Sequence, residues 1–187
     1  MASWFNPPTQ VYRPPCNKRS VSVLRIRKIE REDLDALFAL DKLCFRPGIA
    51  YSKAQLKYFL RHPCCLSCAA VDLSDKLLGF AIAESYLEGG RRIGHIVTID
   101  VSPDSRRKGV GRLLMQAMTK GLADLGACAI RLEVAVDNVE AQAFYLQLGF
   151  IAGARISGFY MGTLDALSMQ LPLNSAATQL PEAGGVG

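Results

Sequence analysis

Hydrophobic and polar positions between residues 21 and 173 follow two periods, which predict an alternation of strands and helices. Apolar residues alternate with polar ones, or run together between polar turns, in seven segments, and these predict strands over 21–28, 65–72, 77–85, 93–101, 128–135, 150–156 and 164–171. Apolar residues at helical spacing predict four helices, over 31–43, 52–62, 107–125 and 138–148. The order β-α-α-β-β-β-α-β-α-β-β predicts an α/β (α+β) fold with one mixed central sheet of about seven strands flanked by about four helices.

Capping residues support the predicted helix ends. Ser52 and Gln55 have the spacing of a capping box, and Asp137 is expected to cap the fourth helix with Glu140 as its partner. Gly126 and Gly149 stand where helices commonly end. The third helix is expected to bury one stripe, formed by Leu113, Leu114, Ala117, Met118, Leu122 and Leu125.

Composition divides the chain into one folded unit and two flanking segments. Residues 1–20 contain four prolines and few aliphatic residues, which predicts a flexible lead-in. Residues 174–187 are rich in Ala, Gly, Pro and polar residues, which predicts a disordered tail. Residues 21–173 are therefore expected to form a single domain, with a monomer or a homodimer left open.

Charge and cysteine content narrow the function classes. The net charge is +5, and much of the excess lies in one cluster within the folded part, which favours a compact anionic ligand over a nucleic-acid surface. We expect no membrane partner, because no apolar run has the length of a membrane span and the first residues do not have the pattern of a signal peptide. A cytoplasmic protein with reduced thiols is therefore predicted.

The spacing of Cys65 and Cys68 admits a metal-binding reading. A structural zinc site needs a second pair of ligands at matching spacing, and the nearby His62 alone does not supply it. We therefore predict no metal and treat Cys64, Cys65 and Cys68 as strand residues.

The segment from Ile96 to Leu114 has the pattern of a phosphate-binding site. An apolar strand leads through a turn into Arg106-Arg107-Lys108-Gly109-Val110-Gly111-Arg112, which opens the third helix. Glycine lets the backbone approach an anion closely, and free N–H groups at a helix start attract negative charge. The spacing fits neither a Walker A loop nor a dinucleotide fingerprint. The plainer alternative is a helix start with a solvated basic face.

This loop resembles the signature of the GNAT acetyltransferase superfamily. Arg106-x-x-Gly109-x-Gly111 matches the family pattern (Gln/Arg)-x-x-Gly-x-(Gly/Ala), which holds the pyrophosphate of coenzyme A. The resemblance implies acetyl-CoA as cosubstrate, with the strand backbone at Ile99, Asp100 and Val101 beside its pantetheine arm. The loop residues implied in binding are Arg106, Arg107, Lys108, Gly109, Val110, Gly111 and Arg112.

A second block resembles the bacterial protein-alanine N-acetyltransferases, with Leu132-Glu133-Val134 followed by Asn138 and then Ala143-Phe144-Tyr145 and Gly149-Phe150. The resemblance covers roughly residues 24–173. It implies acetylation of a protein or peptide N-terminus, with Glu133 as general base, Tyr145 as general acid and Asn138 in contact with the cofactor. The plainer alternatives are a surface carboxylate paired with Arg131, a core aromatic ring and a helix cap, respectively.

The acceptor side is expected in two loops. The resemblance implies that residues 45–51 and the last hairpin, around Gly158-Phe159-Tyr160, line the acceptor groove, where the family more often has Tyr-Tyr in place of Phe159-Tyr160. Two other functions stay open at this point. One is a small-molecule amine acetyltransferase, acting on a polyamine, an aminoglycoside or an amino acid, and the other is a non-catalytic acetyl-CoA-binding module.

Overall fold

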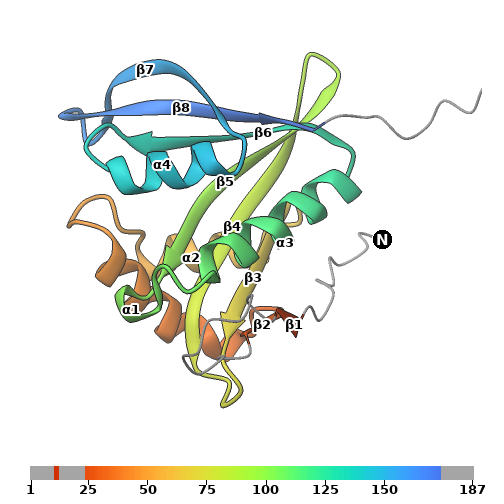
Figure 1. Ribbon diagram of the computed structural model, residues 1–187, viewed down its shortest axis with the longest axis vertical. Coiled ribbons are helices and arrows are strands. Elements are labelled where there is room, and N and C mark those ends of the chain that lie inside the picture. Colours follow the sequence, from red (N-terminus) through yellow and green to blue (C-terminus); the bar gives the residue numbers. More distant parts are fainter. Residues whose placement is uncertain (1–10, 13–23, 174–187) are drawn as a thin grey trace, which may run out of the picture.

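A computed structural model describes residues 11–12 and 24–173 and places their strands in one sheet (Figure 1). Its strand order is β1-β2-β3-β4-β5-β6-β8-β7. The strands are β1 (Val11–Tyr12), β2 (Leu24–Arg27), β3 (Cys65–Val71), β4 (Leu77–Glu88), β5 (Arg91–Val101), β6 (Ala127–Ala135), β7 (Ile151–Tyr160) and β8 (Leu164–Pro172). Neighbours are antiparallel except β5 and β6, which are parallel and are joined through a helix. The predicted single mixed sheet is confirmed.

Four α-helices and two short 3₁₀ turns connect the strands of the described region. They are η1 (Arg31–Asp33), α1 (Leu34–Cys44), α2 (Lys53–Arg61), η2 (Pro103–Ser105), α3 (Val110–Asp124) and α4 (Val139–Gln147). The predicted capping box of the second helix is present, because the Ser52 side chain accepts from the Gln55 amide and Gln55 binds back to the Ser52 backbone. Within the described residues, no helix combines the length and the apolarity needed to cross a membrane.

The helices cover the two faces of the sheet. The sheet lies between two clusters of buried side chains, one on each face. On one face α3 packs against β3, β4 and β5, as Figure 1 shows, and buries Leu113, Leu114 and Met118. Tyr145 from α4 belongs to the same cluster. On the other face, Leu37 from α1 and Leu56 from α2 pack with Phe80 and Ile82 of β4 and with β3. We call these two sides the α3 face and the α1 face.

β5 and β6 separate halfway along their length. They pair from Arg92 to His95, which faces Arg131, and no pairing with β6 follows, so the strands diverge in Figure 1. Next to this point β5 has a bulge: Ile96 pairs with Ala83 and Thr98 with Ile82, which leaves Val97 without a partner on β4. The rest of β5 therefore has one backbone edge that β6 does not occupy.

Three sequence expectations need correction. The third helix begins at Val110 instead of residue 107, because Arg107 has a φ of +58° and Gly109 a φ of +86°, neither of which continues a helix. Leu125 lies outside the buried stripe and is 43% exposed, since it is the C-cap of α3. The fourth helix is capped by Asn138 and not by Asp137.

The flanking segments fall largely outside the described residues. Val11 and Tyr12, within the predicted lead-in, form β1 and pair with β2. The other residues of the lead-in, the start of the predicted first strand and the predicted tail over 174–187 lie outside the described residues.

Candidate active site

The start of α3 presents unpaired backbone N–H groups. The first helical hydrogen bond runs from the Leu113 amide to the Gly109 carbonyl, at 3.0 Å. The amides of Val110, Gly111 and Arg112 therefore have no helical acceptor, and the dipole of a 15-residue helix adds to their positive potential. No acidic residue lies in the first turn of α3. The helix start is thus suited to an anion.

The basic loop residues lie around this helix start. Arg106, Arg107, Lys108 and Arg112 are exposed. Val110 is buried in the core, so it offers only its backbone. The structure therefore brings the predicted loop residues to one place, with the charged side chains in solvent.

Gly111 packs closely against α4. A Cβ atom at this position would stand 3.2 Å from the Phe144 ring, which is tighter than ordinary van der Waals contact. The glycine therefore lets the start of α3 lie against α4, the helix that carries Tyr145. The signature glycine thus connects the basic loop to the remaining predicted site.

The open edge of β5 leads to the basic loop. Ile99, Asp100 and Val101 pair with β4 on one side only, and the Arg106 Nε donates to the Val101 carbonyl at 3.4 Å. The side chains of Ile99 and Val101 pack against the α3 face. The three residues predicted to lie beside the pantetheine arm therefore occupy the stretch of β5 between the bulge and the loop that precedes α3.

Asp100 points to the opposite side and is fully buried. One carboxylate oxygen accepts from the Thr98 hydroxyl at 2.8 Å, while Oδ1 has no partner. Burial raises the pKa of Asp100 to about 7, and the nearby charge of Asp41 adds to the shift. Asp41, from α1, accepts from the Tyr51 amide at 2.7 Å, and burial raises its pKa to about 6. Two buried carboxyl groups therefore lie under the predicted acceptor loop.

Glu133 lies in a cluster that crosses three strands. Its Oε2 is 2.7 Å from the Nε2 atom of His95 on β5, and the Nδ1 atom of the same ring is 3.4 Å from Oε1 of Glu84 on β4. Arg131, the partner considered for Glu133, binds Glu88 instead. Sequence reasoning missed Glu84 and His95, although a histidine and an acid within two predicted strands were a visible signal.

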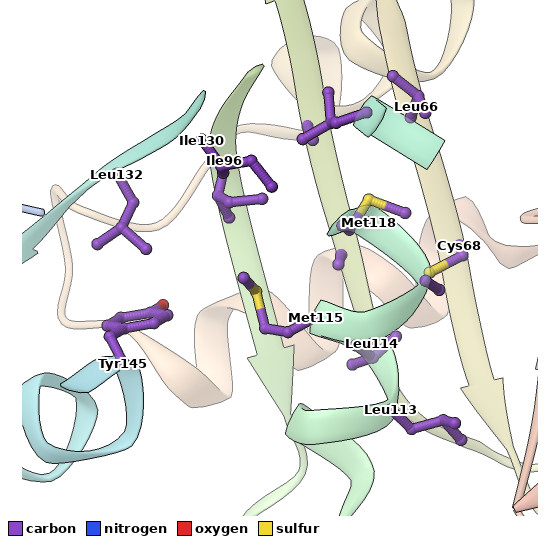
Figure 2. Packing of buried hydrophobic residues seen from close by; sticks show 14 of the residues in the cluster. Leu66, Cys68, Ile96, Leu113, Leu114, Met115, Met118, Ile130, Leu132 and Tyr145 are labelled. Carbon is purple, nitrogen blue, oxygen red and sulfur yellow. The ribbon is translucent and has the colours of Figure 1, made fainter. Parts of the chain in front are cut away.

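Tyr145 lies on the other side of the gap between β5 and β6. Figure 2 shows its ring rising from α4 beneath Leu132, among the buried side chains of the α3 face. The ring centroid is 5.6 Å from that of Phe150. Burial raises the pKa of the Tyr145 phenol well above its usual range, with smaller contributions from Tyr160 and Asp100. The hydroxyl therefore keeps its proton at neutral pH.

Asn138 acts at the start of α4. Its Oδ1 accepts from the Ala141 amide at 3.1 Å, so the side chain caps the helix. Asp137, which was expected in that role, pairs with Arg46 of the α1–α2 loop at 2.9 Å. The cap of α4 therefore lies one residue later than predicted.

The two predicted acceptor loops contact each other and the Glu133 cluster. A Cβ atom at Gly48 would overlap the Met161 side chain of the last hairpin. The Tyr160 hydroxyl donates to the Glu133 carbonyl at 3.1 Å, and the Tyr51 hydroxyl donates to the Val97 carbonyl at the bulge, at 3.3 Å. One acceptor loop thus contacts the backbone of Glu133, and the other contacts β5 at the bulge.

The cysteines of the described region form no metal centre. Cys68 is buried in β3, while Cys64 is exposed at its start, and burial raises the thiol pKa of Cys65 to about 11. Within residues 24–173, no group of three or more His, Cys, Asp or Glu side chains is arranged to hold a metal ion.

Comparisons with known proteins identify the family to which the chain belongs. The sequence model of the Acetyltransferase (GNAT) family matches residues 31–150. N-alpha-acetyltransferase 30 from Schizosaccharomyces pombe is 32% identical over 117 residues, which cover 62% of this chain and 77% of the relative. The [ribosomal protein bS18]-alanine N-acetyltransferase of Salmonella typhimurium is 32% identical over 103 residues, which cover 54% of this chain and 67% of the relative.

Solved structures share the fold. The crystal structure of the ribosomal-protein-S18-alanine N-acetyltransferase from Escherichia coli matches with a TM-score of 0.71 and 25% identity, over 84% of this chain and 99% of that one. The NatC complex bound to Gag peptide and CoA matches with a TM-score of 0.73 and 23% identity, over 81% and 99% of the two chains, which is evidence for the fold alone. The resemblance and the fold class inferred from the sequence are confirmed.

Proposed function

The chain belongs to the GNAT acetyltransferase family and is an N-acetyltransferase, and on this basis we propose that it transfers acetyl from acetyl-CoA to the N-terminal α-amine of a protein or peptide. The observation that carries the proposal is the free edge of β5, which runs from the Glu133 cluster to the start of α3. We further propose that the enzyme works in the cytoplasm, as a monomer or a homodimer, without a metal.

The residues of the loop fit coenzyme A chemically. Its pyrophosphate would be held by the free amides of Val110, Gly111 and Arg112 together with the basic side chains around them. The unpaired edge at Ile99 to Val101 offers backbone groups to an amide-containing arm. Acetyl-CoA, when bound, supplies the thioester that is attacked. We include Asn138 among the residues proposed to bind acetyl-CoA only because it lies at the start of α4.

Glu133 and Tyr145 are proposed to handle the protons. The nucleophile must be a neutral amine, so a carboxylate near the acceptor has to take one proton. Glu133 is proposed for this role, and its backbone carbonyl accepts from the Tyr160 hydroxyl of the last hairpin. Tyr145 retains its proton at neutral pH and lies across the gap, where it donates to the departing sulfur. The nitrogen–carbon bond forms, the carbon–sulfur bond breaks, and Tyr145 protonates the leaving thiolate. The second proton that the nitrogen loses returns to Tyr145 through solvent.

The acceptor loops support a peptide end as substrate. Residues 45–51 and the hairpin around Tyr160 contact each other through Gly48 and Met161, and the Tyr160 hydroxyl donates to the Glu133 carbonyl. In this proposal an extended chain end lies along these two loops. The relative from Schizosaccharomyces pombe is named as an N-alpha-acetyltransferase, which supports the same class of acceptor.

One observation favours the alternative of a small cationic amine. Glu84 and Glu133 both lie beside the acceptor loops, and carboxylates provide the counter-charge that polyamines need. His95 between them offsets part of this charge when it is protonated. An experiment is therefore needed to distinguish a peptide N-terminus from a small cationic amine as the acceptor.

The test is an acetylation panel read by mass spectrometry. Purified protein is incubated with acetyl-CoA and with peptides that begin with Ala, Ser, Met or Thr, an N-terminally blocked Lys peptide and spermidine. Acetylation of free peptide N-termini alone supports the proposal and identifies the preferred first residue. Acetylation of spermidine or lysine alone overturns it in favour of the second acceptor class. Cofactor binding without any acetylated product would support a non-catalytic module.

A further inference from the structure

The contacts among three neighbouring strands point to a function that the predicted acid–base pair does not include. We propose that His95 and Glu84 form a side-chain relay that carries the proton of the acceptor amine from Glu133 to solvent. The relay rests on the proposed function, because it needs a reaction that delivers a proton to Glu133. In this scheme His95 and Glu84 act through Glu133 and are positioning and proton-transferring residues.

The three side chains lie in a row of increasing exposure. Their relative accessibilities are 21% for Glu133, 25% for His95 and 39% for Glu84, so the row leads outward. The two contacts join different nitrogen atoms of one ring, at 2.7 Å to Glu133 and 3.4 Å to Glu84. The register of β4, β5 and β6 brings the three residues together, since Glu84 pairs with His95, and His95 pairs with Arg131, two residues before Glu133.

The chemistry of imidazole explains why two carboxylates matter. A neutral ring has one N–H donor, while the protonated ring has two. Flanking carboxylates therefore stabilise the charged form, and the pKa of His95 rises above its usual value although burial acts to lower it. The contacts with both carboxylates make this ring able to take a proton on one nitrogen and release one from the other.

The relay balances as a sequence of transfers. The acceptor ammonium gives a proton to Glu133, which passes it to Nε2 of a neutral His95 ring whose Nδ1 carries hydrogen. The Nδ1 proton moves to Glu84, and Glu84 releases it to water. Each residue ends in the state in which it began, apart from the tautomer of the ring, which a rotation or a solvent exchange restores. No oxidant, metal or additional reactant is needed.

Other titratable groups around the row do not replace it. Tyr160 is held by the Glu133 carbonyl, and burial raises its pKa to about 12. Tyr51 is held by the Val97 carbonyl, and burial raises its pKa to about 12 as well. Arg131, next to Glu133 on β6, is bound to Glu88. Both phenols therefore stay protonated near neutral pH, which leaves the ring to exchange protons there.

The test compares pH–rate profiles of four proteins with the preferred acceptor. Glu84→Gln should lower kcat about tenfold, and the acid limb should move to lower pH by about one unit, because His95 loses one stabilising charge. His95→Asn should lower kcat by roughly 10²-fold. Glu88→Gln is the matched control, since Glu88 lies on β4 in an ion pair outside the row, and it should keep both the rate and the limb. A Glu84→Gln profile identical to that of the wild type overturns the relay.

A second measurement does not depend on activity. The chain has two histidines, so imidazole NMR resolves His95, which the His95→Asn variant identifies. The pKa of His95 should lie above the ordinary histidine value in the wild type and fall in Glu84→Gln. An unshifted or lowered value in the wild type overturns the relay. If no amine in the panel is acetylated, the proposed function fails, and the titration still decides whether the row is coupled.

Discussion

The two faces of the central sheet differ in what they bury. The α3 face is closed by aliphatic and sulfur-containing side chains, and among the buried members of its cluster in the described region Tyr145 supplies the single hydroxyl. The α1 face buries polar groups beside its apolar ones: Asp41, Thr98 and Asp100 are nearly inaccessible. The Glu84–His95–Glu133 row crosses the neighbouring strands β4, β5 and β6. The central strands β3, β4 and β5 contribute side chains to both faces.

This difference indicates that one face of the domain mainly provides stability and the other mainly holds titratable groups. The α3 face gains hydrophobic free energy and holds the start of α3 and the ring of Tyr145 in place. The α1 face gives up some of that gain, because buried carboxyl groups without full hydrogen bonding are costly. Stability should therefore respond most to changes on the first face, and pH sensitivity to changes on the second.

Leu114→Ala tests the stabilising side most strongly. Leu114 is fully buried on α3, and its truncation should lower the free energy of unfolding by about 3 kcal/mol through lost burial and a cavity. Urea denaturation measures the change. Gln116→Ala, at an exposed position of the same helix, should stay within about 0.5 kcal/mol. Equal effects of the two variants would show that the α3 face does not dominate stability.

Tyr145→Phe tests the one hydroxyl of the apolar cluster. Loss of the proton donor should lower kcat by roughly 10²-fold, while the ring and its packing remain. Steady-state kinetics with the preferred acceptor measures the effect, and the unfolding transition checks the fold. Tyr58→Phe, at an exposed tyrosine of α2, is the control. A variant with the full rate would remove Tyr145 from the mechanism.

Asp100→Asn tests how much the buried carboxyl group on the α1 face lowers the free energy of unfolding. Burial raises the pKa of Asp100 to about 7, so the folded protein binds a proton that the unfolded chain has already lost. Stability should therefore decrease as pH rises from the ordinary aspartate pKa to about 7, and between pH 5 and 8 Asp100 should account for roughly 2 kcal/mol of the decrease. Asp41, with a pKa raised to about 6, adds to the same trend.

The measurement for Asp100 is the slope of unfolding free energy against pH. Asp100→Asn should flatten it, and Asp124→Asn, at an exposed ion pair with Lys120, should not. A wild-type protein that becomes more stable from pH 5 to pH 8 would contradict the assignment of a raised carboxyl pKa to this face.

Gly48→Ala has the smallest expected effect and tests the contact between the acceptor loops. The residue has a φ of +92° and faces Met161, so an added methyl group is both strained and obstructed. The KM for a peptide acceptor should rise roughly fivefold, equivalent to about 1 kcal/mol, with an unchanged KM for acetyl-CoA. Gly90→Ala is the control, because Gly90 also has positive φ but meets nothing nearby. Equal effects on both KM values would argue against an acceptor loop.

Local patterns were sufficient to predict most of the fold. The apolar periods predicted the order of the elements, and the capping box at Ser52 and the glycines after α3 and α4 predicted helix ends. The basic loop was recognised because its features are contiguous in sequence. Tyr145 and Glu133 were found through motif resemblance, and their chemical roles remain predictions.

Contacts between distant segments could not be read from these patterns. Glu84, His95 and Glu133 meet only because three strands pair in a particular register. The bulge at Val97 has a similar consequence: with strict alternation, Asp100 would share the face of Ile96, whereas the extra residue turns it to the α1 face. The cap of α4 lies one residue later than predicted, and Asp137 instead binds an arginine from a remote loop.

That ion pair has a mechanical consequence for turnover. Arg46 belongs to the loop that rests on β5, and Asp137 follows the end of β6, so their contact ties together the two arms of the divided sheet. Both side chains are well exposed, at 72% and 42%, and such a pair is worth less than about 1 kcal/mol. A contact of this strength forms and breaks thermally, and ionic strength should therefore change the fraction of time for which the two segments are linked.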